Sequence, residues 1–250
     1  AGFQALANSI RTTGTGTISL NQNKDADPFL SINTIQNAVN AISNSGSGAN
    51  TIDVGAGSFA EDVLLDRTLT LNGANAGIAV DGGRGAETTI APTTTGLRVT
   101  ADNVTVDGFS ITGGTNAVNL DGSDATTIVN TIISSTSGDA VTGNAATNAV
   151  IDDNSISNAG GSGILLDNGS HNALIEDNII NTTGASAIKV VFSDASTIRN
   201  NAIGYTDRGV TSAGAYNISD DGILLLFASN GSGTRTTITG NQITDTLSTG

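Results

Sequence analysis

Four carboxylates form the densest group of chemically capable side chains in this sequence. Asp152 and Asp153 precede Glu176 and Asp177 by 24 residues, and each pair follows an apolar residue in the same local pattern. If the chain repeats with that period, the two pairs come onto neighbouring strands, within about 5–6 Å of each other. Carboxylate oxygens at such distances are typical ligands of Ca²⁺. The alternative is a solvated acidic face that Arg199, one repeat further on, partly neutralises.

A second group of candidate residues lies where the regular pattern is interrupted. The sequence carries extra residues between Ile203 and Ile223, which predicts an insertion loop over 204–222. Loops on rigid scaffolds often carry function, although a tolerated surface insertion explains the same pattern. The candidate binding residues of this loop are Tyr205, Asp207, Arg208, Tyr216, Asp220 and Asp221.

The chain offers little else for nucleophilic or metal chemistry. His171 is the one histidine, and its turn sequence predicts a surface residue without a catalytic partner. A histidine-based metal site needs several nitrogen or sulfur ligands. Cysteine is absent, so there is neither a disulfide framework nor thiol chemistry.

A short phrase recurs along the chain and predicts the architecture. Its first apolar residue stands at 106, 128, 151, 175 and 198, in steps of 22, 23, 24 and 23 residues. Each copy alternates apolar and polar residues, as strands do, and turn-forming residues separate the copies. This period without helical spacing predicts an all-β fold, a right-handed parallel β-helix with coils about 4.8 Å apart. Because one coil cannot bury its own apolar face, stability must come from stacked neighbours.

One asparagine recurs three residues after the apolar anchor of successive copies. Asparagine tolerates the left-handed backbone of a sharp bend, and its amide can bond to equivalent amides above and below. We therefore expect a structural ladder of Asn154, Asn178, Asn201 and Asn241.

The sequence divides into an N-terminal segment and one long domain. Residues 1–30 predict a strand and a linker, and residues 31–250 predict a single β-helix domain. The stretch 31–46 predicts an amphipathic helix that caps the first coil, with Asn33 as its N-cap. The apolar face of this helix consists of Ile35, Ala38, Val39 and Ile42.

Composition narrows the partners and the location. The net charge is −14 and the pI about 4.1, which disfavours nucleic acid and anionic membranes as partners. No apolar run is long enough for membrane insertion. Acidic, lysine-poor chains rich in Thr, Ser, Asn and Gly are typical of secreted bacterial proteins, so we expect an extracellular, cell-surface location. The missing methionine and the unfinished last coil suggest a processed chain or a segment of a longer protein.

Several segments near the N-terminus resemble a known family. Residues 34–41, 51–59, 61–63 and 69–73 resemble the start of pectin methylesterases and related proteins of the pectin-lyase-like superfold. The later motifs of pectin methylesterases and polygalacturonases are missing. Residues 104–250 instead resemble the β-helix repeats of bacterial surface proteins and filamentous adhesins.

A more limited resemblance concerns the acidic cluster. An acidic group beside a basic residue is similar to the site of calcium-dependent polysaccharide lyases. That resemblance implies that Asp152, Asp153, Glu176 and Asp177 hold the metal and that Arg199 or Lys189 acts as the base.

The sequence favours a structural role over catalysis. Aromatic residues make up 3% of the chain and tryptophan is absent, which argues against a long glycan-binding groove. The leading hypothesis is an extracellular structural or adhesive module of a bacterial surface protein or filament, including head-to-tail stacking of copies. Its partners would be itself or cell-surface glycans, with no required cofactor beyond an optional calcium ion. The alternative is a carbohydrate-active enzyme, a calcium-dependent polysaccharide lyase.

Overall fold

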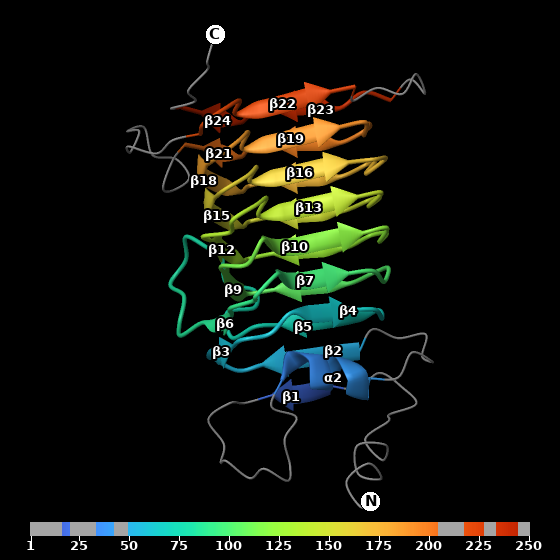
Figure 1. Cartoon of the computed structure of the whole chain (residues 1–250), viewed down its shortest axis with the longest axis vertical. Coiled ribbons are helices and arrows are strands. Elements are labelled where there is room, and N and C mark those ends of the chain that lie inside the picture. The colour runs from blue at the N-terminus through green and yellow to red at the C-terminus, as the bar shows by residue number, and fades with distance from the viewer. Residues whose placement is uncertain (1–16, 21–33, 43–49, 205–217, 228–233, 245–250) are drawn as a thin grey trace, which may run out of the picture.

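The computed structural model describes residues 17–20, 34–42, 50–204, 218–227 and 234–244. The chain winds into a solenoid in which strands of successive coils lie above one another (Figure 1). Every strand pairing is parallel, and partners along the regular region are 22 to 24 residues apart, as in Val106–Ile128 and Ile151–Ile175. The predicted parallel β-helix, an all-β fold with one short helix among the described residues, is confirmed.

Three parallel sheets run along the solenoid, and each complete coil of the described residues contributes one strand to each sheet. Sheet A contains β1 (Thr17–Leu20), β2 (Asn50–Val54), β5 (Leu69–Asn72), β8 (Thr105–Asp107), β11 (Thr127–Val129), β14 (Val150–Asp152), β17 (Leu174–Glu176), β20 (Thr197–Arg199) and β23 (Thr237–Thr239). Sheet B contains β3 (Gly57–Phe59), β6 (Thr88–Ile90), β9 (Phe109–Thr112), β12 (Ile132–Ser134), β15 (Ser155–Ala159), β18 (Ile179–Thr183), β21 (Ala202–Ile203) and β24 (Gln242–Ile243). Sheet C contains β4 (Val63–Leu65), β7 (Thr95–Val99), β10 (Asn116–Asp121), β13 (Val141–Asn144), β16 (Ile164–Asp167), β19 (Ile188–Val191) and β22 (Ile223–Leu226).

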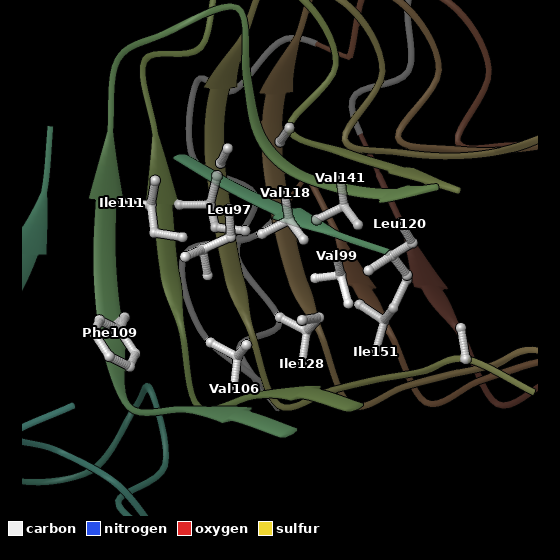
Figure 2. Close-up of a cluster of buried hydrophobic side chains, with 14 of the residues drawn as sticks. Leu97, Val99, Val106, Phe109, Ile111, Val118, Leu120, Ile128, Val141 and Ile151 are labelled. Atoms are coloured by element: carbon white, nitrogen blue, oxygen red, sulfur yellow. The ribbon is translucent and has the colours of Figure 1, made fainter. Parts of the chain in front are cut away.

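The interior is filled by columns of aliphatic side chains. Ile151 pairs with Ile175 and Ile175 pairs with Ile198, and all three side chains are fully buried. Figure 2 shows side chains of the three sheets converging on this interior, with Val118 of sheet C lying among them. Each fully buried aliphatic side chain contributes about 1.5–3 kcal/mol relative to an exposed one. The repeated apolar positions therefore supply the free energy that holds the coils together.

Helix α2 (Ile35–Ala41) lies at the N-terminal end of the solenoid, beside β4 and β2 (Figure 1). Its predicted apolar face is confirmed, because Ile35, Ala38, Val39 and Ile42 are all buried. The predicted N-cap was wrong: the Thr34 hydroxyl, one residue after Asn33, accepts from the Asn37 amide at 3.1 Å. The Glu61 carboxylate accepts the amides of Ile35 and Gln36 at 2.7 and 3.1 Å. A side chain of the first coil thus holds the positive end of the helix.

The same helix covers the terminal strand of sheet C. The Gln36 side chain accepts from the Leu64 amide at 2.6 Å and donates to the Leu64 carbonyl at 3.3 Å. Leu64 lies in β4, which forms one edge of sheet C. The glutamine amide therefore replaces the missing neighbour strand, and such protection of edges limits unwanted strand pairing.

The loop of residues 73–87, between β5 and β6, is fastened by a buried arginine. The Arg84 side chain is 6% exposed and forms a bidentate pair with Glu87 at 2.8 and 2.9 Å. It also donates to the carbonyls of Ile78 at 2.9 Å and Asn130 at 2.8 Å. The most distant partner of Arg84 lies 46 residues away in the sequence, so no local sequence pattern marks this arginine as the residue that holds the loop.

Candidate functional site

The predicted acidic face is assembled on the outer side of sheet A. The register places Asp152 beside Glu176 and Glu176 beside Arg199 on three successive strands. Their neighbours Ile151 and Ile175 point into the core, so strand alternation directs the charged side chains outward. The repeat therefore brings two carboxylates and one guanidinium into one column.

Glu176 is engaged by Arg199. The Arg199 Nε atom lies 2.5 Å from Glu176 Oε2. This hydrogen bond and the charge of Glu176 raise the pKa of the Arg199 guanidinium above its usual value, and Asp177 and Asp152 add smaller effects in the same direction. Arg199 thus partly neutralises the face, as in the alternative to calcium binding that the sequence left open.

Asp153 and Asp177 occupy a sharp corner between sheets A and B. Their backbone φ angles are 50° and 53°, in the left-handed region. Gly, Asn and Asp are the residue types that enter this region most readily. The same position of other coils carries Gly108, Asn130, Asn200 and Gly240, all with positive φ. Backbone geometry therefore accounts for the carboxylates at 153 and 177 without a ligand.

The described residues contain no group of three or more His, Cys, Asp or Glu side chains arranged to hold a metal ion. The calcium site at Asp152, Asp153, Glu176 and Asp177 stays a prediction.

The corner is completed by a column of stacked asparagines. The side-chain amide of Asn154 donates to Oδ1 of Asn178 at 3.0 Å, Asn178 donates to Asn201 at 3.0 Å, and Asn201 donates to Asn241 at 2.8 Å. Each acceptor oxygen also takes the backbone amide of the preceding asparagine, at 2.9–3.1 Å. Asn154, Asn178 and Asn201 are fully buried. The column begins where Asn154 accepts the Thr131 amide at 3.0 Å.

Among the described residues of the insertion, Asp220 and Asp221 do not lie on the acidic face. Tyr205, Asp207, Arg208 and Tyr216 lie outside the described residues. Asp220 and Asp221 lie at the corner between sheets B and C, where Asp220 Oδ2 accepts from the Ser186 hydroxyl at 3.3 Å and the Asp221 carbonyl accepts from the Ala187 amide at 3.0 Å. Sheet A, which carries Asp152 and Glu176, does not border that corner.

The two candidate bases also lie apart. Lys189 is on β19 of sheet C, in register with Leu165 and Leu224. Arg199 is on β20 of sheet A. Only Arg199 shares a face with the acidic column.

His171 has a partner that the sequence did not reveal. Its Nδ1 atom accepts from the Asp194 backbone amide at 3.0 Å and lies 2.5 Å from Asp194 Oδ1. Asp194 is 4% exposed. His171 therefore joins two adjacent coils rather than standing as an isolated surface residue. The signal was present in the period, because position 194 is 23 residues after position 171.

Two exposed phenylalanines form a feature that sequence reasoning missed. Phe192 and Phe227 follow β19 and β22, and their rings stack with centroids 5.0 Å apart. The available signal was the loss of alternation, since the runs 188–192 and 223–227 carry apolar residues at positions that are polar in other coils.

The family described as the right-handed beta helix region matches residues 62–203. This is more than half of the chain, which therefore belongs to the right-handed β-helix family. No curated protein matches the sequence.

Solved structures share the fold at low sequence identity. The catalytic domain of a GH87 alpha-1,3-glucanase in complex with nigerose is 14% identical with a TM-score of 0.50, over 88% of this chain and 46% of that chain. This chain thus spans about half of the glucanase domain. Pectate lyase Pel9A is 13% identical with a TM-score of 0.41, over 93% of this chain and 78% of that chain. At these identities the similarity to the glucanase is one of fold alone.

The helices of the described segments include none with the length and apolar character needed to cross a bilayer.

Proposed function

We propose that the chain is a rigid structural module of an extracellular bacterial surface protein, and that it presents adhesive side chains on its outer faces. The observation that carries this proposal is the use of acidic side chains as bonds between coils. Asp107 accepts from the Asn130 side chain at 2.8 Å, and Asp139 accepts from the Ser162 amide at 2.6 Å. Further contacts between coils involve Asp53, Asp62, Asp102, Asp121, Asp124 and Glu176.

These contacts explain the composition physically. A chain with net charge −14 repels itself, and hydrogen bonds from amides, hydroxyls and arginines to the carboxylates offset that repulsion. Together with the asparagine column they make each outer face part of the scaffold. The secreted, cell-surface location belongs to the proposal and is supported by the acidic, lysine-poor composition, which is rich in Thr, Ser, Asn and Gly.

The alternative function is a carbohydrate-active enzyme, a calcium-dependent polysaccharide lyase. The observation in its favour is the pairing of Asp152 with Glu176 on adjacent strands, with Arg199 one strand further. The fold shared with the glucanase is compatible with either function, because one fold hosts many activities.

One assay separates the two functions. The protein is incubated with neutral and acidic polysaccharides, with and without calcium, and both its depletion from solution and the release of reducing or unsaturated sugar ends are measured. A structural adhesive module binds without product. Product that disappears in the double variant Asp152→Asn, Glu176→Gln would overturn the proposal in favour of the enzyme.

Head-to-tail stacking of copies is the filament version of the proposal. Because α2 covers the β4 edge of sheet C, stacked copies would leave that sheet without a continuous strand ladder. Electron microscopy of the purified chain tests this version, and dispersed monomers alone at high concentration would remove it.

A further inference from the structure

Phe192 and Phe227 are the most exposed large apolar side chains in the described part of the chain. They are 56% and 73% exposed. Their rings are nearly parallel, at 5°, with a centroid distance of 5.0 Å. They sit one above the other on adjacent coils, since the Phe192 amide donates to the Leu226 carbonyl at 3.0 Å. The pair is therefore a rigid aromatic stack fixed to the scaffold.

Both phenylalanines occupy a backbone conformation that does not suit them. Their φ angles are 48° and 51°, in the left-handed region. A bulky residue there is an outlier, and the strain must be compensated by the surroundings. In preceding coils the same corner position carries Gly122, Ala145 and Asn168, also with positive φ. A turn alone thus does not require an aromatic ring at this position, and exposed strained residues point to a use outside the fold.

Three outward side chains beside the stack, on the same two coils, are apolar, and the fourth is Lys189. Val191 and Leu226 are register partners on the outer face of sheet C. Leu224 lies on the same face and is the register partner of Lys189. We call Val191, Phe192, Leu224, Leu226 and Phe227 the phenylalanine platform. One coil earlier, the positions equivalent to Val191 and Phe192 carry polar residues. An exposed apolar patch of this kind on a protein surface marks an interaction site.

The polar border consists of Asp167 and Asn168. Asn168 is exposed, and its side-chain amide donates to Asn144 Oδ1 at 3.0 Å. The platform thus places aromatic and aliphatic surface within one coil of carboxylate and amide groups. This combination suits a ligand with one apolar face and a rim of hydroxyl groups.

Charge selects among ligands of that shape. The chain carries a net charge of −14, which repels anionic lipids, acidic polysaccharides and a second copy of the chain. Lys189 adjoins Leu224 in the platform, which disfavours a basic protein surface at this place. A neutral ligand meets neither penalty.

We propose that the phenylalanine platform binds a neutral polysaccharide, with the apolar face of a sugar ring against the stacked pair of Phe192 and Phe227 as a unit and its hydroxyl groups toward Asn168 and Asp167. This inference rests on the proposed adhesive function and names its ligand class. Aromatic side chains, Phe included, are enriched at the centres of binding surfaces, where each buries a large apolar area.

The test uses co-sedimentation of the full chain with insoluble cellulose, chitin and α-glucan, and binding to soluble polygalacturonate as the anionic counterpart. The wild type should bind at least one neutral polysaccharide and not polygalacturonate. The double variant Phe192→Asn, Phe227→Asn should weaken that binding on the order of tenfold or more. Asparagine already occupies this corner at position 168 with φ 50°, so the variant should keep the fold and a melting temperature at or above that of the wild type.

The matched control is Leu64→Asn, which replaces an exposed leucine (38%) on the outer face of sheet C, in the coil of β4. It should bind as the wild type does. Unchanged binding by the folded phenylalanine double variant, binding of no neutral polysaccharide by the wild type, or equal binding to polygalacturonate would each overturn the inference.

Two further measurements distinguish other occupants and the two levels of the proposal. Flotation with vesicles of neutral phosphatidylcholine detects binding to a lipid surface, and sedimentation velocity detects association with a second copy of the chain. If the double variant loses one of these interactions but keeps saccharide binding, the platform binds that occupant instead. If the double variant still binds polysaccharide and releases no product, the platform is rejected as the binding site and the adhesive function stands. Release of sugar products rejects the adhesive function itself.

Discussion

Asn178 and Asn201 are joined by two hydrogen bonds to one oxygen. Oδ1 of Asn201 accepts both the side-chain amide of Asn178 at 3.0 Å and its backbone amide at 3.1 Å. The side-chain amide of Asn178 also donates to the carbonyls of Ile151 at 2.8 Å and Glu176 at 2.9 Å. The Asn178 side chain thus satisfies backbone groups in its own coil and in the preceding coil, and it bonds to the asparagine side chain of the next coil.

Replacing Asn178 with alanine should destabilise the solenoid by about 1–3 kcal/mol, because buried donors and acceptors lose their partners. The measurement is the free energy of unfolding by chemical denaturation. Asn119→Ala, on the outer face of sheet C, is the control and should be nearly neutral. Equal unfolding curves for wild type and Asn178→Ala would show that water replaces the ladder bonds.

Replacing Gln36 with alanine should expose the edge of sheet C without unfolding the chain. Gln36 makes two hydrogen bonds to the backbone of Leu64, and their loss should cost about 1 kcal/mol. The sensitive measurement is hydrogen exchange at the Leu64 amide, which should accelerate while amides of the central coils keep their protection. Asn37→Ala, on the exposed side of α2, is the control. Unaltered exchange at Leu64 would mean that the glutamine does not protect the edge.

The fold was predictable from the sequence because its information is periodic. Every coil repeats the same apolar position, so Ile151, Ile175 and Ile198 could be placed in one column before any coordinates, and they do lie there. A column of identical polar residues at that period is similarly visible. Local departures from the period also carried information, as the insertion after Ile203 did.

The helix docking, the phenylalanine pair and the position of Asp220 could not be predicted, because they depend on contacts that the repeat does not encode. Gln36 pairs with a strand 28 residues away, at a distance fixed by how the helix docks and not by any period. Phe192 and Phe227 lie at a corner where alternation stops, so neither inward nor outward orientation followed from their sequence positions. The placement of Asp220 relative to Glu176 required knowing at which corner of the coil the insertion leaves the repeat.

Acid should weaken the clamp between Asp62 and the strand-end residues Thr93 and Thr94. Partial burial raises the pKa of the Asp62 carboxyl, but hydrogen bonds from Thr94 and then Thr93 outweigh it and hold the pKa below its usual value. The carboxylate accepts from both hydroxyls, at 2.7 and 2.8 Å, and from both amides. Because the unfolded chain binds the proton more readily, this stabilisation is complete above the ordinary aspartate pKa of about 4 and disappears as the pH falls through the lower folded value.

The measurement for this clamp compares wild type with Asp62→Asn. The stability difference between them should be largest near neutral pH and should shrink below about pH 4. A difference that stays constant through the acid range would mean that Asp62 keeps its ordinary pKa in the folded chain.

Close stacking of coils at the corner between sheets B and C should make Gly184 intolerant of any side chain. A Cβ atom at Gly184 would lie 2.1 Å from the Gly160 carbonyl oxygen in the neighbouring coil. That oxygen belongs to the backbone and cannot rotate away, so Gly184→Ala must separate two coils locally and should cost about 1–3 kcal/mol. The matched control is Gly83→Ala, where a Cβ would meet no atom within 4 Å, and it should leave the unfolding midpoint within experimental error of the wild type. Equal stability of the two variants would mean that the coils can separate at this corner without penalty, and a solenoid with such freedom would not serve as a rigid support for the phenylalanine platform.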